Sequence, residues 1–202
     1  MAIGEKLAEF YQWKRFLIEV DGTSMAALFE IIRAASESRI KLLSKRNAVG
    51  ISPNIDRPPL VFGHWMSLIL VSGRSLRITF KAHFMTEAAK FFAARPFQLK
   101  QDEVSQSRAI DFYREYVNLT AGNIKQVLAE NKIQVGVSLP ALARGFDDVF
   151  FPRRPGMQTR SWRFSCDAAE FFCSSHVELF EPIVIKKNPG NEVQDKGNVE
   201  YI

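Results

Sequence analysis

The sequence contains only two cysteines, Cys166 and Cys173, among its 202 residues. A single pair of cysteines excludes a framework of several disulfides, and without a second pair it gives no zinc-binding pattern, so we expect free, partly buried thiols. The chain also lacks about 20 consecutive apolar residues, which a membrane-spanning helix requires. Its first residues contain no basic segment followed by an apolar run, so we expect no secretory signal, no membrane association and a cytoplasmic location.

Motifs of several functional classes are also missing. The chain contains no Gly-x-x-x-x-Gly-Lys phosphate loop, and no serine stands in a Gly-x-Ser-x-Gly elbow. The net charge of +5 is compatible with an acidic partner, but the basic residues are scattered and no nucleic-acid-binding motif appears. The sequence therefore does not favour nucleic acid as a partner, although a basic nucleic-acid-binding domain stays a third hypothesis.

Hydrophobic periodicity and turn residues predict the order of the elements in the first half of the chain. A helix is expected from Met25 to about Leu43, with Thr23 or Ser24 as its N-cap, before a proline-containing loop over 47–59. Two β-rich runs then predict a hairpin, and Thr86 begins a short helix that Pro96 ends. The two hairpin strands are expected over 60–71 and 76–84.

The second half of the chain predicts one long helix followed by further strands. Residues 102–131 contain no proline, and only Gly122 interrupts their helical composition, whereas 135–185 return to strand-like patterning. We expect an α+β domain with both long helices on one face of an antiparallel β-sheet. The expected organisation is an N-terminal extension over 1–20, one domain over 21–185 and a flexible C-terminal tail over 186–202.

The long helix has a polar edge opposite its apolar face. At about 100° per residue, Asp111, Glu115, Asn118 and Gly122 fall within a sector of about 60°. Aromatic and aliphatic residues from Tyr113 to Leu128 are centred on the opposite side. Helix interiors disfavour Asn and Gly by about 0.7 and 1 kcal/mol relative to Ala, so an exposed Asn118 and Gly122 suggest a functional edge as an alternative to ordinary solvation.

These residues form a motif of a known family. The pattern Asp111-x-x-x-Glu115-x-x-Asn118, followed by Leu-Thr-Ala-Gly-Asn and later by Pro140, resembles the signature of the CheC/CheX/FliY family of chemotaxis phosphatases. It is most similar to the single-motif CheX branch, and the resemblance extends over about residues 24–185. Pro140 follows after one residue fewer than the family pattern implies.

The resemblance implies a protein phosphatase that acts on a phosphorylated response regulator of the CheY type. Asn118 would orient the attacking water through its amide, and Glu115 would dock the partner by pairing with a lysine of the regulator. Asp111 matches the acidic or serine position and would belong to the partner-binding edge, while Gly122 would let the partner's backbone come close. The chain itself would bind no cofactor, and Mg²⁺ would belong to the partner's receiver domain.

The resemblance also implies a single site per chain. Aligning Ser24 of the first helix with Asp111 places Leu28 and Ile31 at the two functional positions, and neither side chain supports the chemistry. Relatives of the CheX branch form dimers, so a homodimer is implied here. The alternative hypothesis is a non-catalytic signalling module that binds a receiver domain through the same helix. Residues 1–20, the segment around Pro152-Arg-Arg-Pro and the tail have no counterpart in the pattern.

Overall fold

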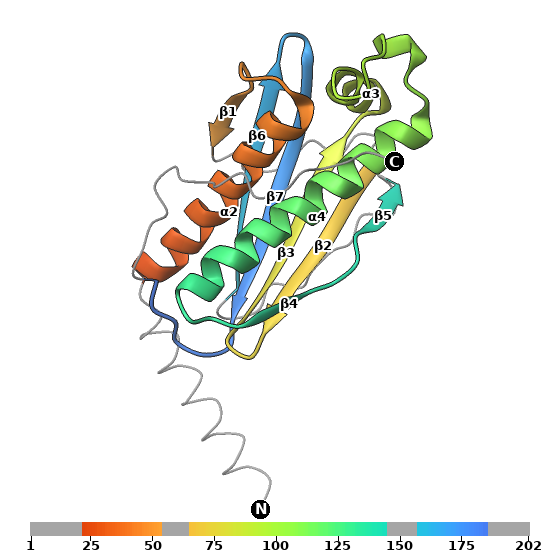
Figure 1. Cartoon of the computed structure of the whole chain (residues 1–202). Helices are drawn as coiled ribbons and strands as arrows, with labels where there is room; N and C mark the ends of the chain where they lie inside the picture. The colour runs from red at the N-terminus through yellow and green to blue at the C-terminus, as the bar shows by residue number, and fades with distance from the viewer. Residues whose placement is uncertain (1–21, 54–64, 145–156, 186–202) are drawn as a thin grey trace, which may run out of the picture.

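The computed structural model describes residues 22–53, 65–144 and 157–185 (Figure 1). The expected N-terminal extension over 1–20 and the expected tail over 186–202 lie outside the described residues, as does the Pro-Arg-Arg-Pro segment. The boundaries proposed for these parts therefore stay predictions.

An antiparallel sheet of seven strands forms one layer of the described part. Its order is β1-β6-β7-β3-β2-β4, and β5 pairs with β2 beside β4. The long central strands β3, β7 and β6 pair over most of their lengths. The strands are β1 (Gly50–Pro53), β2 (Trp65–Gly73), β3 (Leu76–Phe84), β4 (Val135–Val137), β5 (Ala141–Arg144), β6 (Met157–Cys166) and β7 (Ala169–Leu179).

Helices form a second layer on one face of this sheet, as predicted. The two long helices, α2 (Gly22–Ser44) and α4 (Gln106–Glu130), lie side by side across the sheet in Figure 1, and α3 (Thr86–Ala94) packs near one end. A short 3₁₀ helix, η1 (Gln101–Glu103), precedes α4. No helix in the described part is long and apolar enough to cross a membrane. The predicted α+β architecture is confirmed.

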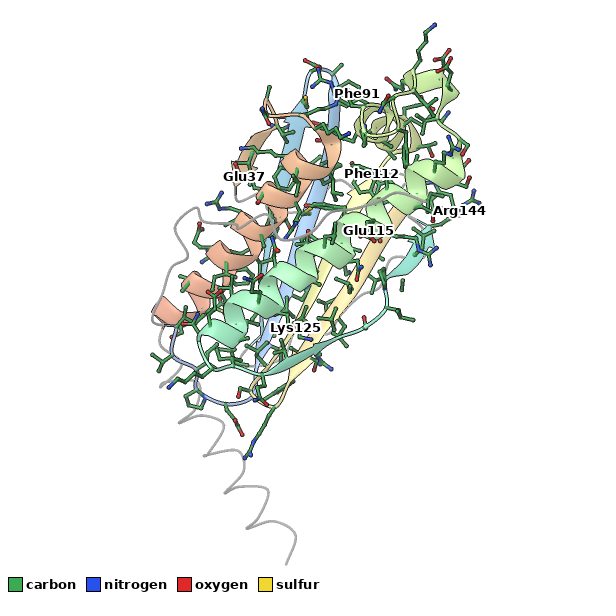
Figure 2. The ribbon with its side chains drawn as sticks, viewed as in Figure 1. Glu37, Phe91, Phe112, Glu115, Lys125 and Arg144 are labelled. Carbon is green, nitrogen blue, oxygen red and sulfur yellow. The ribbon has the colours of Figure 1, made fainter. Side chains whose placement is uncertain are left out.

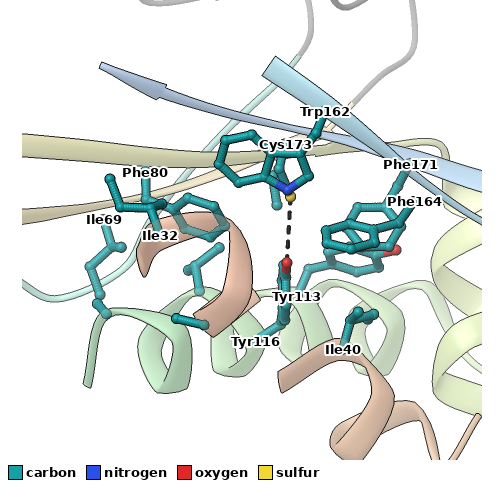
Figure 3. Close-up of a cluster of buried hydrophobic side chains, with 14 of the residues drawn as sticks. Ile32, Ile40, Ile69, Phe80, Tyr113, Tyr116, Trp162, Phe164, Phe171 and Cys173 are labelled. Atoms are coloured by element: carbon teal, nitrogen blue, oxygen red, sulfur yellow. Dashed lines mark hydrogen bonds between the residues drawn. The ribbon is translucent and has the colours of Figure 1, made fainter. Parts of the chain in front are cut away.

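The core lies between the two layers because alternate strand residues point toward the helices. On β3, the five alternate residues from Leu76 to Phe84 are each at most 1% exposed. Aromatic rings from several elements meet in the middle of this layer (Figure 3). Phe171 of β7 lies 5.1 Å from Tyr113 and 5.7 Å from Tyr116, measured between ring centroids, and it stacks on Phe164. These contacts join α4 to the central strands.

Several predicted boundaries are corrected by the structure. The expected loop over 47–59 contains β1, whose four residues pair with β6 despite their Gly and Pro content. Helix α2 begins at Gly22, so Thr23 and Ser24 both lie inside the helix and neither is its N-cap. The long helix begins at Gln106, four residues after the expected start, because η1 occupies the preceding turn. It continues through Gly122 to Glu130.

Candidate functional site

Helix α4 positions the candidate site, and local hydrogen bonds fix both of its ends. Ser105 is the N-cap, and its Oγ accepts a hydrogen bond from the backbone N–H of Arg108 at 3.3 Å. At the other end, the side-chain amide of Asn131 donates to the carbonyl of Val127 at 2.9 Å. The first bond satisfies a backbone N–H that a helix start leaves without an intrahelical partner, and the second adds a contact at the last turn. The 25 residues between the caps therefore form a defined rod.

The apolar face of α4 is held against the sheet by aromatic packing. The ring of Tyr113 stacks on Phe84 of β3 with 4.0 Å between centroids, and Tyr116 makes an edge contact with Phe80 at 6.0 Å. Thr120 is fully buried, and its hydroxyl donates to the carbonyl of Tyr116 at 2.8 Å. Because large side chains lock this face, the rotation of α4 about its axis is fixed, and with it the direction of the opposite face.

A polar contact between the two long helices also positions α4. Arg39 of α2 donates from its guanidinium to the side-chain oxygen of Asn123, which is 7% exposed. The sequence analysis does not predict this positioning role of Asn123. On the helical wheel Asn123 lies about 120° from Asp111, next to the apolar face. A buried side-chain amide needs a hydrogen-bond partner, so an Asn at this position could have indicated a polar contact. The contact helps fix the position of α4 beside α2.

The predicted functional residues lie together on the face of α4 that points away from the sheet. Asp111, Asn118 and Gly122 are exposed, and Glu115 is half-buried; Figure 2 shows Glu115 between Phe112 and Lys125 along the helix. Asn118 follows Asp111 by seven positions, a rise of about 10.5 Å at 1.5 Å per residue. We call the line of Asp111, Glu115, Asn118 and Gly122 the polar edge of α4.

The members of the polar edge differ in their interactions. Asp111 forms an ion pair with Arg114 at 3.5 Å, and its side chain is 68% exposed, so this pair adds little stability. Glu115 and Asn118 form no hydrogen bond or ion pair with other side chains anywhere in the described part of the chain. Their carboxylate and amide groups are therefore available to another molecule.

Gly122 has no packing role among the residues that the structure describes. A Cβ atom built at this position would meet no heavy atom within 4 Å. Glycine destabilises a helix interior by about 1 kcal/mol relative to alanine, and here no intramolecular contact explains it. The absence of a side chain leaves the helix backbone accessible one turn beyond Asn118.

The corresponding positions of α2 are part of the core. Leu28 is fully buried, Ile31 is 2% exposed, and Ser24 is 9% exposed. The polar edge is therefore not repeated on α2.

Tyr116 and Cys173 form a buried polar contact between α4 and β7. Tyr116 Oη lies 3.4 Å from the Sγ of Cys173, the contact that Figure 3 marks with a dashed line. Burial raises the pKa of the Cys173 thiol and of the Tyr116 phenol well above their usual values. A thiol that stays protonated is a poor nucleophile. Both cysteines are free and buried, as expected.

Three described acidic side chains near the cysteines lie apart from one another. Asp167 lies in the turn between β6 and β7, Glu170 pairs with Arg163 at 3.5 Å, and Glu178 pairs with Arg77. Among residues 22–53, 65–144 and 157–185, no group of three or more His, Cys, Asp or Glu side chains is arranged to hold a metal ion.

Comparison with solved structures decides the fold. The chemotaxis protein CheX from Vibrio vulnificus superposes with a TM-score of 0.60 at 18% identity, covering 73% of this chain and 96% of that protein. A CheC-like superfamily protein from Shewanella sp. PV-4 gives 0.61 at 16% identity, covering 75% and 97%. The chain has the CheC-like fold. CheX from Borrelia burgdorferi, solved in complex with CheY, BeF₃ and Mg²⁺, gives 0.60 at 14% identity, covering 79% and 99%.

The CheC-like fold accounts for nearly the whole length of these neighbours and about three quarters of this chain. The resemblance read from the sequence is thus confirmed at the level of the fold. No family model and no curated protein sequence matches the chain. The likeness to these structures therefore lies in the arrangement of helices and strands, whereas the sequence identity is only 14–18%.

Proposed function

We propose that this chain hydrolyses the aspartyl phosphate of a CheY-type response regulator through the polar edge of α4. One observation carries the proposal: Glu115 and Asn118 stand one turn apart on the outer face of a rigid helix, without side-chain partners in the described part of a CheC-like fold. The Borrelia CheX complex, which contains CheY and Mg²⁺, supports a receiver-type partner. A cytoplasmic location and a homodimer belong to the same proposal.

The chemistry requires a water molecule placed in line with the phosphorus atom. As the water oxygen bonds to phosphorus, the bond to the aspartate oxygen breaks, releasing a carboxylate and inorganic phosphate. Catalysis of phosphoryl transfer depends mainly on positioning and electrostatic stabilisation. The amide of Asn118 suits the positioning role, since it both accepts and donates hydrogen bonds. Mg²⁺ is assigned to the receiver domain, so this chain needs no metal ligands of its own.

The other members of the polar edge would align the two proteins. Glu115 is one turn before Asn118 and offers a carboxylate to a cation of the partner, which sets the register of the helix on the receiver. Asp111 lies a further turn away and is assigned only to partner binding. Gly122 follows Asn118 by one turn, and the open space at its Cα lets the partner's backbone approach the helix.

The proposal is tested with receiver domains from the same genome. Each receiver is phosphorylated with a small phosphodonor in the presence of Mg²⁺, and phosphate release is followed with and without this chain. We expect one receiver to lose phosphate faster, and Asn118→Ala to remove most of that acceleration while binding persists. Gln126→Ala is the matched control, because it removes another exposed amide from α4 about 12 Å farther along the helix.

The same assay separates the enzyme from a binding module. If a receiver binds the chain but its phosphate is lost at the unassisted rate, the non-catalytic hypothesis replaces the phosphatase. If Asn118→Ala and Gln126→Ala have equal effects, Asn118 has no special role in the reaction.

A further inference from the structure

Two basic side chains border the polar edge of α4 on one flank. A wheel of about 100° per residue that starts at Asp111 places Arg114 at about 300° and Lys125 at about 320°. Asn118 lies next to them at about 340°. Arg114 precedes Asn118 by four positions and Lys125 follows it by seven, so the cations bracket the amide, about 6 Å before it and 10.5 Å after it along the helix axis. Both basic side chains are exposed.

The packing of α4 shows which way this flank points. Asn123 lies at about 120° on the same wheel, and its side chain contacts Arg39 of α2. The side of α4 near 120° therefore faces α2, and the flank near 300° faces the opposite way. On that side α4 packs beside β2 and β4, and Figure 2 shows Lys125 on the side of the helix toward β4. The two cations therefore point toward the edge of the sheet that β4 and β5 form.

A third cation, Arg144 of β5, lies on the same side. The register pairs Arg144 with Trp65 of β2, and Trp65 with Phe84 of β3. Tyr113 of α4 stacks on Phe84, so Arg144 is level with the turn of the helix that carries Arg114. The Cζ of Arg144 is 5.0 Å from the centroid of the Trp65 ring, a stacking contact that positions the charge without neutralising it. We call Arg114, Lys125 and Arg144 the basic flank.

Acidic residues neutralise the basic flank only in part. Asp111 pairs with Arg114 at 3.5 Å. Lys125 and Arg144 form no ion pair with any residue in the described ranges of the chain. The sequence over 131–144, which includes β4 and β5, contains two basic residues and no Asp or Glu. The basic flank therefore keeps a net positive charge beside Asn118.

The proposed reaction brings an anionic surface to this flank, and this step rests on the proposed function. An aspartyl phosphate is negatively charged, and proteins hold Mg²⁺ beside a phosphate with one or two carboxylates. When Asn118 reaches such a site, the cations before and after it on α4 face the rim of the partner's pocket. Charges at the rim of an interface mainly increase the rate of association with a surface of opposite sign.

We propose that the basic flank is a docking surface for the acidic rim of the receiver's phosphorylation site and that it steers this site onto Asn118. Sequence patterns do not indicate this surface, because Arg144 joins Arg114 and Lys125 only through the pairing of β5 with β2. The flank places three cations along about 16 Å of α4. Proteins that bind nucleic acid strongly can contact about 6–10 phosphates, so an acidic protein surface suits this flank better.

Association kinetics test the inference with the full chain and receiver domains from the same genome, each loaded with Mg²⁺ and BeF₃. The flank variant is Lys125→Glu with Arg144→Glu. The matched control, Lys45→Glu with Arg74→Glu, changes the net charge equally at exposed positions after α2 and in the turn between β2 and β3. At about 0.02 M salt, the association rate constant should fall at least about tenfold in the flank variant and less than about twofold in the control.

Salt and a conservative variant show whether charge is the cause. The difference between the flank variant and the control should shrink below about threefold at about 0.5 M salt, because the screening length then falls to a few Å. Lys125→Arg with Arg144→Lys keeps both charges and should associate at the natural rate. Lys125→Gln with Arg144→Gln replaces the charge reversal if that variant unfolds in circular dichroism melts, and it should slow association at least about threefold.

The inference is overturned if the flank and control variants associate equally fast with a receiver that the natural chain binds, or if the chain binds no receiver. Duplex DNA is the comparison ligand: loss of DNA binding in the flank variant with unchanged receiver binding would assign the flank to nucleic acid instead. Phosphate release keeps the two proposals apart. Accelerated release with equal flank and control variants would leave the phosphatase standing and remove the docking surface.

The opposite result is also distinct. A receiver that binds through the basic flank but loses phosphate at the unassisted rate would support the docking surface and remove the phosphatase. In an active chain, the flank variant should raise KM at least about tenfold at low salt and leave kcat unchanged, because it slows the encounter. Asn118→Ala should instead lower kcat. A flank variant that lowers kcat with KM unchanged would contradict a role in docking.

Discussion

Gly122→Ala is expected to stabilise the protein. The position lies inside α4 and is exposed, and a Cβ atom added there would have no heavy atom within 4 Å. Alanine restricts the unfolded backbone more than glycine does, and it is the best helix former. Because no steric cost offsets these terms, the free energy of unfolding should rise by about 1 kcal/mol.

Urea denaturation followed by circular dichroism measures this change. A gain of about 1 kcal/mol also corresponds to a rise of about 2–4 °C in the melting temperature for a protein of this size. Gly73→Ala is the contrasting control, because the added Cβ would overlap the carbonyl oxygen of Gln134 and should destabilise the protein. A Gly122→Ala protein that is less stable than the natural chain would refute the reasoning and reveal a contact at this position.

The same position separates stability from function. Gly122→Leu retains good helix propensity and should not unfold the chain. Its side chain fills the space that we assign to the partner's backbone, so receiver binding should weaken at least tenfold. Unchanged receiver binding would remove Gly122 from the polar edge while leaving the roles of Asn118 and Glu115 intact.

Three further predictions concern the core, pH and docking. Phe171→Ala should lower the free energy of unfolding by about 3–5 kcal/mol in urea titrations, because the ring is fully buried among other aromatics. Burial raises the pKa of Cys173, Tyr113 and Tyr116, so the unfolded chain loses these protons first, and stability should fall as pH rises above about 9. A flat stability profile between pH 8 and about 10.5 would contradict this. Glu115→Arg should weaken receiver binding at least tenfold in a titration, whereas Glu130→Arg should not.

The sequence predicts the helical layer well because its signals are long and periodic. The apolar stripe of α4 identifies the buried face from Tyr113 to Leu128, and the absence of proline identifies its extent. The first residue of α4 could not be predicted from the sequence, because η1 and the N-cap Ser105 depend on how the chain approaches the sheet. Periodicity describes a helix, whereas its ends depend on local hydrogen bonds.

Strand β1 was missed because its sequence, Gly-Ile-Ser-Pro, has little intrinsic preference for a strand. It forms at the edge of the sheet, where pairing with β6 supplies hydrogen bonds that local sequence does not indicate. A proline is tolerated there because an edge strand has one unpaired side. Hydrophobic periodicity and turn residues describe only neighbouring positions, so they do not predict pairing between strands that are far apart in the sequence.

The polar edge could be predicted because it depends on spacing along one helix. Asp111, Glu115 and Asn118 emerge on the outer face whichever strands lie below them. The contact between Arg39 and Asn123 could not be predicted, since it joins residues 84 positions apart and depends on the packing of α2 against α4.

The most direct test of the central claim is the rate of phosphate release from a phosphorylated receiver domain in the presence of the Asn118→Ala protein. Alanine favours a helix by about 0.7 kcal/mol over asparagine, so this variant should be at least as stable as the natural chain. We predict that it still binds the receiver and that release returns to within a few-fold of the unassisted rate. An Asn118→Ala protein that accelerates release as strongly as the natural chain would contradict the proposed mechanism.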